Sequence, residues 1–235
     1  KKLYISFFAA LALNVSSNAQ VLGILDPTFG NGGTSILSPV IPTYFDNAQD
    51  VVVQADGKSV FCGTSGTVMD FDITVVRLRE DGSLDASFGT NGVFNFVNTL
   101  GSDFAYDIEL LSDGKFLITG ATALSVTNTQ FVLMRLTADG LLDDTFGTGG
   151  VFTFDLDGGE DYSRQILVSN DGYIIVGSSM VPNMMNNRIG LVKCTLTGEL
   201  DSQFGNEGSL IHTFSTDGDV TPMGAAMTAT GLIII

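Results

Sequence analysis

Short runs of apolar residues alternate with turn-forming residues along most of the chain. The runs are rich in Val, Ile, Phe and Thr and are bounded by Gly, Asp and Asn, a pattern that predicts β-strands. No window after residue 20 sustains the period of an amphipathic helix. The clearest runs are residues 93–97, 106–111, 116–122, 131–137, 151–155, 165–169, 173–178 and 189–196. The pattern therefore predicts an all-β chain, with four antiparallel strands in each repeating unit.

One motif, LDxxFGxxG, occurs four times and defines a repeat, because its phenylalanines are spaced by 59, 58 and 58 residues. We assign it to structure: the Asp caps a turn, the Phe packs between neighbouring units and the glycines adopt backbone angles that other residues avoid. A glycine-rich phosphate loop is the alternative, but neither a helix nor a suitably placed Lys follows. The motif residues are Asp26, Phe29, Gly30, Asp85, Phe88, Gly89, Asp143, Phe146, Gly147, Asp201, Phe204 and Gly205.

Asp-Gly pairs between apolar runs mark hairpin turns at fixed offsets within each repeat. A first set reads Asp56-Gly57, Asp113-Gly114, Asp171-Gly172 and the degenerate Thr230-Gly231. A second set reads Asp81-Gly82, Asp139-Gly140 and Thr197-Gly198, just before the last three motifs. These turns predict antiparallel hairpins on both sides of each central strand.

Four strands per repeat and no helix predict a β-propeller-like array of four-stranded antiparallel blades, with about 58 residues per repeat. Residues 116–118 and 174–176 are continuously apolar, as expected for strands buried on both faces. We place this domain at residues 20–235, as an incomplete arc of three full blades and a partial fourth. The expected blades are residues 25–83, 84–141, 142–199 and 200–235. The motif is expected to lead from the outer strand of one blade to the inner strand of the next.

A cation recurs at one position of the repeat, as Arg77, Arg135 and Lys193. The strand that carries it alternates apolar and polar residues more than its neighbours do. We therefore predict a strand near the rim, with the cation facing solvent.

The first 19 residues read as a signal peptide. Two lysines precede an apolar run from residue 3 to residue 15, and small residues follow at positions suited to cleavage after Ala19. The run is shorter than the roughly 20 residues that span a bilayer, so we predict no transmembrane segment. A secreted or cell-surface protein is expected. Because the chain stops where the repeat predicts the third strand of blade four, we expect it to be the first arc of a longer protein.

The composition supports a folded, acidic protein, with 44% apolar residues and a net charge of −16. Nucleic acid is not expected as a partner, because phosphate binding needs clustered Lys and Arg. Cys62 and Cys194 belong to the first and third repeats, which are not neighbours in a propeller. We therefore predict two buried thiols rather than a disulfide.

Catalytic chemistry has little support in the sequence. His212 is the single histidine and is expected on the first strand of blade four, at a buried or edge position. No Ser-His-Asp spacing, CxxC or HExxH motif is present, and the absence of Trp weakens a sugar-stacking platform. No catalytic residue and no cofactor is predicted, with calcium as the one exception.

Calcium is the metal that the acidic loops suggest. An aspartate recurs between the first two runs of each repeat, as Asp46, Asp103, Asp161 and, shifted by one residue, Asp219. In the third repeat the weak calcium candidates are Asp155, Asp157, Glu160 and Asp161. They lack the full spacing of an EF-hand loop, and a recurrent Asp is more often a turn cap, which is the interpretation we favour.

Residues 77–92, with the pattern RLxxDGSLDxSFGxxG, together with Asp-Gly-Lys turns that precede strands ending at Gly63 or Gly120, resemble the delta-60 repeat of bacterial secreted proteins. The resemblance covers nearly all of residues 22–235 and implies a β-propeller-like fold with no established catalytic activity. With the predicted signal peptide, it is similar to exported proteins of the Bacteroidetes type.

Two functions remain open from the sequence. The first is an exported noncatalytic module that binds an unknown protein or glycan or acts structurally. The second is a metal-dependent propeller hydrolase or lactonase-like enzyme, with ligands from the acidic loops.

Overall fold

The computed structural model describes residues 25–36, 45–67, 70–125, 127–156, 158–180, 187–213 and 220–235. The predicted signal peptide, Asp157 and Asp219 lie outside these residues. The described residues form strands, turns and connecting segments, with no helix among them. None of them forms a helix that could cross a membrane.

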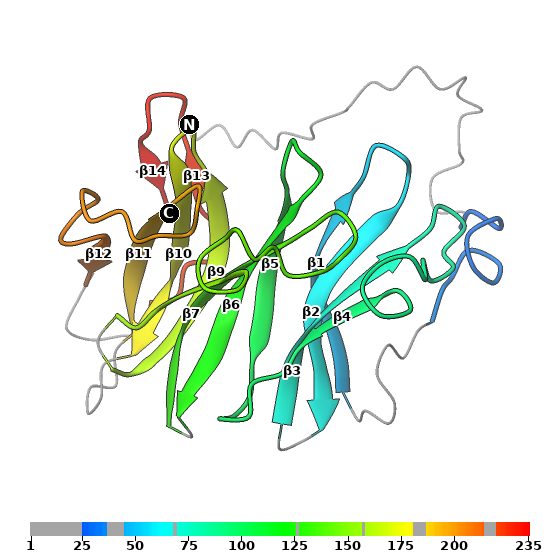
Figure 1. Cartoon of the computed structure of the whole chain (residues 1–235), viewed down its shortest axis with the longest axis horizontal. Coiled ribbons are helices and arrows are strands. Elements are labelled where there is room, and N and C mark those ends of the chain that lie inside the picture. The colour runs from blue at the N-terminus through cyan, green and yellow to red at the C-terminus, as the bar shows by residue number, and fades with distance from the viewer. Residues whose placement is uncertain are drawn as a thin grey trace, which may run out of the picture.

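The strands group into successive antiparallel blades that lie side by side (Figure 1). The first blade contains β1 (Phe45–Val53), β2 (Ser59–Thr67), β3 (Asp70–Leu78) and β4 (Val93–Phe96), paired in that order. The second contains β5 (Phe104–Leu110), β6 (Phe116–Ser125), β7 (Asn128–Leu136) and β8 (Val151–Phe154), and the third β9 (Glu160–Val168), β10 (Gly172–Met180), β11 (Asn187–Thr195) and β12 (Ser209–His212). β13 (Ala226–Met227) and β14 (Ile233–Ile234) form a separate pair beside the third blade. The predicted all-β, propeller-like class is confirmed.

The expected path of the motif between blades is wrong. The strand after the motif pairs with the strand before it: β4 pairs with β3, β8 with β7 and β12 with β11. Each of the last three LDxxFGxxG copies therefore connects the third and fourth strands of one blade. Hydrophobic pattern alone does not separate these two paths, because a strand following the motif buries its apolar face in either case. His212 accordingly ends the fourth strand of the third blade, at an edge of the sheet.

The first set of turns does not follow the sequence pattern in every copy. Gly57, Gly114 and Gly231 adopt φ values of 83°, 84° and 83°, so the degenerate fourth turn keeps the conformation of the first two. The third turn is closed by a Ser169 N–H to Gly172 carbonyl bond and is one residue shorter than the Leu111 to Lys115 turn. Gly172 has no positive φ, so this Asp-Gly pair is not equivalent to the others.

Three apolar clusters lie between successive blades and hold the array together. The first includes Val60 and Cys62 of blade one with Ile118 and Met134 of blade two. The second joins the other face of blade two to blade three, and the third joins blade three to β13 and β14. β6 contributes Ile118 to one cluster and Leu117 to the next, which explains why its sequence is continuously apolar. Cys62 and Cys194 are buried free thiols, as predicted.

The LDxxFGxxG motif fastens each blade to the following one. The Gly89 N–H donates to the Asp139 carbonyl at 2.7 Å, and the Gly147 N–H donates to the Thr197 carbonyl at 2.8 Å. Phe88 and Phe146 are fully buried, and each ring lies against the turn glycine of the next blade. A Cβ on Gly89 or Gly147 would lie 2.3 Å from a backbone oxygen, so glycine is required there.

The recurrent cation is buried, contrary to the solvent-facing position expected from the sequence. Arg77 and Arg135 lie on β3 and β7, which are flanked by strands on both sides. Arg135 Nε donates to Asp143 Oδ2 at 2.7 Å, and its guanidinium carbon lies 4.7 Å from the centroid of the Phe146 ring. Burial would raise the pKa of Asp143, but hydrogen bonds from Lys115 and Thr145 and the charge of Arg135 hold it well below its usual range. The motif covers the cation, because Asp143, Thr145 and Phe146 all contact Arg135.

Replacement of Phe146 tests the role of the motif. Phe146→Ala removes a fully buried ring between two blades and should lower the free energy of unfolding by about 3–5 kcal/mol. Phe29→Ala removes the half-buried first copy and should cost much less. Urea unfolding followed by circular dichroism measures both. Equal losses for the two variants would contradict this assignment.

Candidate functional site on the inner strands

The first strand of each complete blade contains a bulge at the same place. The pairing of β1 with β2, β5 with β6 and β9 with β10 shifts by one residue, at Gln49, Tyr106 and Arg164 respectively. Bulges redirect side chains and frequently occur beside functional sites. The three bulges lie in β1, β5 and β9, which are the first strands of their blades and which we call the inner strands.

The residue after each bulge ties its blade to the next blade. Asp50 Oδ2 accepts the Ile108 N–H at 3.2 Å, and Asp107 Oδ2 accepts the Ile166 N–H at 2.7 Å. Gln165 Oε1 accepts the Ala225 N–H in the same way. The inner strands are thus linked by side chain to backbone bonds that cross from blade to blade.

These ties bring carboxyl groups close together in a partly buried place. Burial raises the pKa of Asp107 to about 7, and the neighbouring Asp50 adds to the shift. Burial and the charge of Asp50 also raise the pKa of Glu109. The buried Cys62 thiol lies in the same region. Its burial raises its pKa far above the usual range, and the negative charges of Asp50 and Asp107 add smaller increases. The thiol therefore stays protonated and is not a nucleophile.

The recurrent loop aspartates serve the connections between blades. Asp103 is fully buried and accepts hydrogen bonds from Thr122 Oγ1 at 2.7 Å and from the Asn98 and Ala123 N–H groups. Burial raises its pKa to about 6 in spite of these bonds. Asp161 accepts the Leu156 N–H at 2.7 Å. Asp103 and Asp161 therefore fix the segments that arrive from β4 and β8.

Asp46 belongs to the same recurrent position in the first blade. It is exposed and accepts a hydrogen bond from Ser65 Oγ at 2.5 Å. The connection that precedes β1 lies outside the described residues, so the structure shows only this one side of its environment.

The described calcium candidates lie in the connection between β8 and β9 and in the first two residues of β9. Asp155 Oδ1 accepts the Gly158 N–H at 2.7 Å, and the Tyr162 hydroxyl donates to Glu160 Oε2 at 3.3 Å. With Asp161 bonded to Leu156, each described candidate has a partner within this loop. No group of three or more potential metal ligands occurs among the described residues. Asp157, the fourth candidate, lies outside them.

Aromatic side chains near the start of the first strands and of β3 form a continuous chain of ring contacts, which we call the aromatic rim. The Phe71 and Phe104 ring centroids lie 5.8 Å apart, and the Tyr106 and Tyr162 centroids lie 6.5 Å apart. The Arg164 guanidinium carbon lies 4.0 Å from the Tyr106 centroid. Burial raises the pKa of Tyr106, and burial together with Glu160 raises that of Tyr162 to about 12, so both hydroxyls stay protonated at neutral pH. The rim consists of Phe45, Phe71, Phe104, Tyr106, Tyr162 and Arg164.

Sequence reasoning did not find the aromatic rim. Its members come from three blades and occupy positions where the repeats differ, so no motif marks them. The equivalent residues of the three first strands are Asn47, Phe104 and Tyr162, and at the bulge Gln49, Tyr106 and Arg164. The available signal was this variation inside otherwise regular strands.

The fold defines a β-propeller-type repeat protein, and comparison with known families agrees. The family model of a domain of unknown function, DUF5122, described as a beta-propeller, matches residues 54–88 and 111–146. Each matched segment begins at the turn after the first strand and ends at the motif Phe, and so includes the second and third strands of one blade. A search of the curated proteins finds no match to the chain.

Asp107 should make stability depend on pH. Its pKa is raised from 3.8 to about 7, so the folded chain binds more protons than the unfolded chain between about pH 4 and pH 7. This contribution to stability is present below that range and is lost as the pH rises through it. Asp107→Asn keeps an acceptor for the Ile166 N–H but does not ionise. The fall in thermal midpoint between about pH 5 and pH 8 should therefore be smaller in this variant.

The exposed Asp113, in the turn after β5, provides the matched control. Asp113→Asn should keep the pH dependence of the unmodified chain. An identical pH profile for Asp107→Asn and Asp113→Asn would contradict the assignment.

Proposed function

We propose that this protein is an exported, noncatalytic β-propeller module that binds a protein or glycan ligand at the aromatic rim. The observation that carries the proposal is a division between repeated and variable positions. The repeated charged residues of the motif and of the third strands make contacts within and between blades, whereas variable positions of the first strands, together with Phe71 of β3, supply the rim.

The repeated residues are engaged in structural contacts. Asp143 bonds to Arg135, Lys115 and Thr145, and Asp103 bonds to the segment between β4 and β5. Asp107 holds the backbone of the next blade. A general acid or base needs access to a substrate, and these carboxyl groups are directed at protein donors instead.

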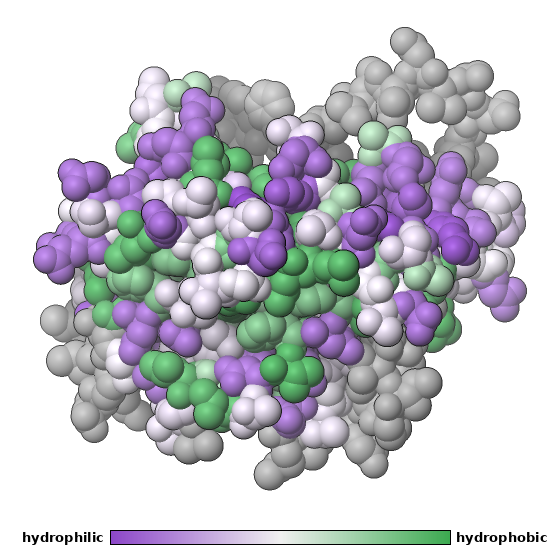
Figure 2. All heavy atoms as spheres, in the orientation of Figure 1, coloured by the Kyte–Doolittle hydropathy of each residue, from purple (hydrophilic) through white to green (hydrophobic). Residues whose placement is uncertain are grey.

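The rim has the chemistry of a recognition surface. The Phe and Tyr rings, half-buried except for the exposed Phe45, offer flat apolar area, Arg164 offers a cation, and Glu160 offers an acceptor beside Tyr162. Aromatic residues and Arg are enriched in the residues that dominate binding energy. On the face of the molecule drawn in Figure 2, hydrophobic residues lie among hydrophilic ones.

A glycan and protein ligand screen tests the proposal. For a ligand found with the full chain, Tyr106→Ala should weaken binding about tenfold or more, because central aromatic residues of an interface contribute about 2 kcal/mol or more. The control is Leu141→Ala, at an exposed position in the turn after β7. Ligands whose affinity is unchanged by Tyr106→Ala would contradict a binding role for the rim, and hydrolysis that depends on a divalent metal would contradict the noncatalytic proposal.

Export rests on the charge and hydropathy pattern of residues 1–19. If the chain is expressed in a bacterium with its first 19 residues, the exported product should begin at Gln20. N-terminal sequencing of that product checks this, and deletion of residues 3–15 is the control that should retain the protein in the cytoplasm. An exported product that still carries residue 1 would contradict cleavage after Ala19.

A further inference from the structure

The motif and its buried cation form an arginine site that recurs along the chain. In the second blade Arg135 donates to Asp143, to Thr145 Oγ1 at 3.0 Å and to the Leu196 carbonyl of the next blade at 2.7 Å. The guanidinium lies over the Phe146 ring. Arg77 makes the equivalent contacts with Asp85, Ser87, Phe88 and the Ala138 carbonyl.

The first copy of the motif has the same local geometry. Thr28 donates its N–H and its Oγ1 to Asp26 Oδ1 at 2.9 and 2.6 Å, as Ser87 does to Asp85 and Thr145 to Asp143. The Gly30 N–H donates to the Asp81 carbonyl at 2.7 Å, as Gly89 and Gly147 donate to the next blade. The first motif is therefore docked on blade one in the same way that the later motifs dock on their blades.

The first copy differs from the second and third copies in two ways: no cation of the described residues lies against its aspartate, and its side chains are more exposed. Asp85 and Asp143 are buried beside an arginine, whereas Asp26 is exposed and the described residues place no Lys or Arg against it. Phe29 is half-buried, whereas Phe88 and Phe146 are fully buried. The Glu80 carbonyl precedes the Asp81-Gly82 turn, as Ala138 and Leu196 precede theirs. All the groups that would hold an arginine are in place.

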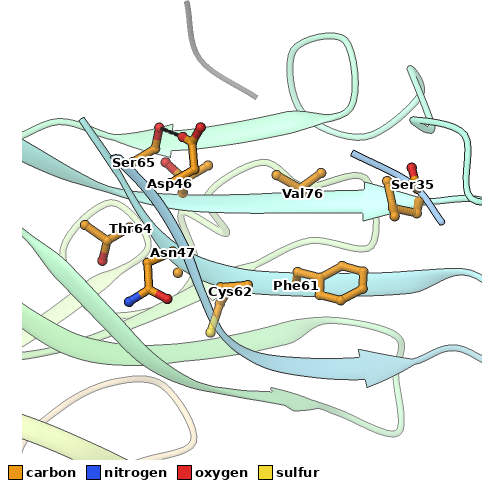
Figure 3. A pocket seen from close by; sticks show the side chains of 12 residues that line it. Ser35, Asp46, Asn47, Phe61, Cys62, Thr64, Ser65 and Val76 are labelled. Atoms are coloured by element: carbon orange, nitrogen blue, oxygen red, sulfur yellow. Dashed lines mark hydrogen bonds between the residues drawn. The ribbon is translucent and has the colours of Figure 1, made fainter. Parts of the chain in front are cut away.

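The described residues cover the sheet face beside this site only in part. Ile118 and Met134, paired on β6 and β7, are fully buried under blade one. The equivalent pair in blade one, Phe61 and Val76, is half-buried and lines a cavity of about 280 Å³ with Ser35 (Figure 3). Ser35 belongs to the segment that follows the first motif, so the arginine site and this partly covered sheet face are continuous.

We propose that Asp26, Thr28, Phe29 and the Glu80 carbonyl form a preformed site for an arginine, and that its occupant is a β-strand of the third-strand type supplied by a partner segment. Charge argues for this occupant, because the acidic site matches the cation of every such strand. Backbone geometry argues for it too. The Arg77 N–H donates to the Gly92 carbonyl and its carbonyl accepts from the Asp85 N–H. The corresponding groups in the first copy are the Gly33 carbonyl and the Asp26 N–H.

A peptide with the sequence of residues 70–78, DFDITVVRL, serves as the probe because it is the third strand of blade one. A fluorescent form of this peptide should bind the full chain, as measured by anisotropy. Replacing the arginine (Arg77→Ala in the peptide) should weaken binding at least about tenfold, because hydrogen bonds to a charged group contribute about 1.5–3 kcal/mol. Asp26→Asn in the chain should weaken binding of the unmodified peptide to a similar extent.

Asp113→Asn is the matched control in the chain, because it removes an exposed turn carboxylate elsewhere, and it should leave peptide affinity unchanged. Absence of binding, or equal affinity for the arginine and alanine peptides, would overturn the proposal. Binding that is insensitive to Asp26→Asn would place the peptide elsewhere and overturn it as well. Light scattering without peptide provides a further check, since a dimer that Asp26→Asn abolishes would assign the site to a second copy of the chain rather than to a partner strand.

Discussion

The buried contact between the third-strand cation and the motif aspartate is the interaction on which the array depends. It joins the third strand of a blade to the motif that follows this strand, and the same arginine reaches a carbonyl of the next blade. A buried charge is strongly unfavourable unless it is paired and fully hydrogen-bonded. Arg135 meets this condition with a carboxylate, a hydroxyl, a carbonyl and an aromatic face. The fold of the motif and the position of the neighbouring blade are therefore specified together.

The third blade shows what happens when this contact is varied. Lys193 replaces arginine there, and its ammonium group lies 2.7 Å from Asp171 and 2.9 Å from Asp201. No lysine follows the shortened turn before β10, so one cation serves two carboxylates, and their hydrogen bonds raise its pKa. The Asp201 side chain is 22% exposed, compared with 6% for Asp143. The turn of the next blade, which reaches Arg135 and covers Phe146, has no counterpart against Lys193 among the described residues, so the site of the third blade is more open.

Much of the fold could be predicted because the repeat is marked by glycines at positions where the backbone conformation excludes most other residues. Gly89 and Gly147 adopt φ values near 50°, and the spacing of the phenylalanines that precede these glycines gave the repeat length directly. The blade boundaries could not be predicted in the same way. Whether the strand after Gly92 pairs backward or forward depends on backbone bonds such as Arg77 N–H to the Gly92 carbonyl, which leave no trace in the apolar pattern. The burial of Arg77 follows from that pairing and was missed for the same reason.

The candidate site was less predictable than the fold because its members do not repeat. Asp107 follows a bulge, and whether a strand residue lies before or after a bulge decides which way its side chain points. Tyr106 and Arg164 occupy equivalent positions in successive blades. One carries an aromatic ring and the other a cation, and the two contact each other across the blade interface. A repeat scaffold allows such positions to change freely, because the blade contacts are made elsewhere, by the motif and by the flat faces of the middle strands. Specificity in this molecule is therefore expected where the repeat is least regular.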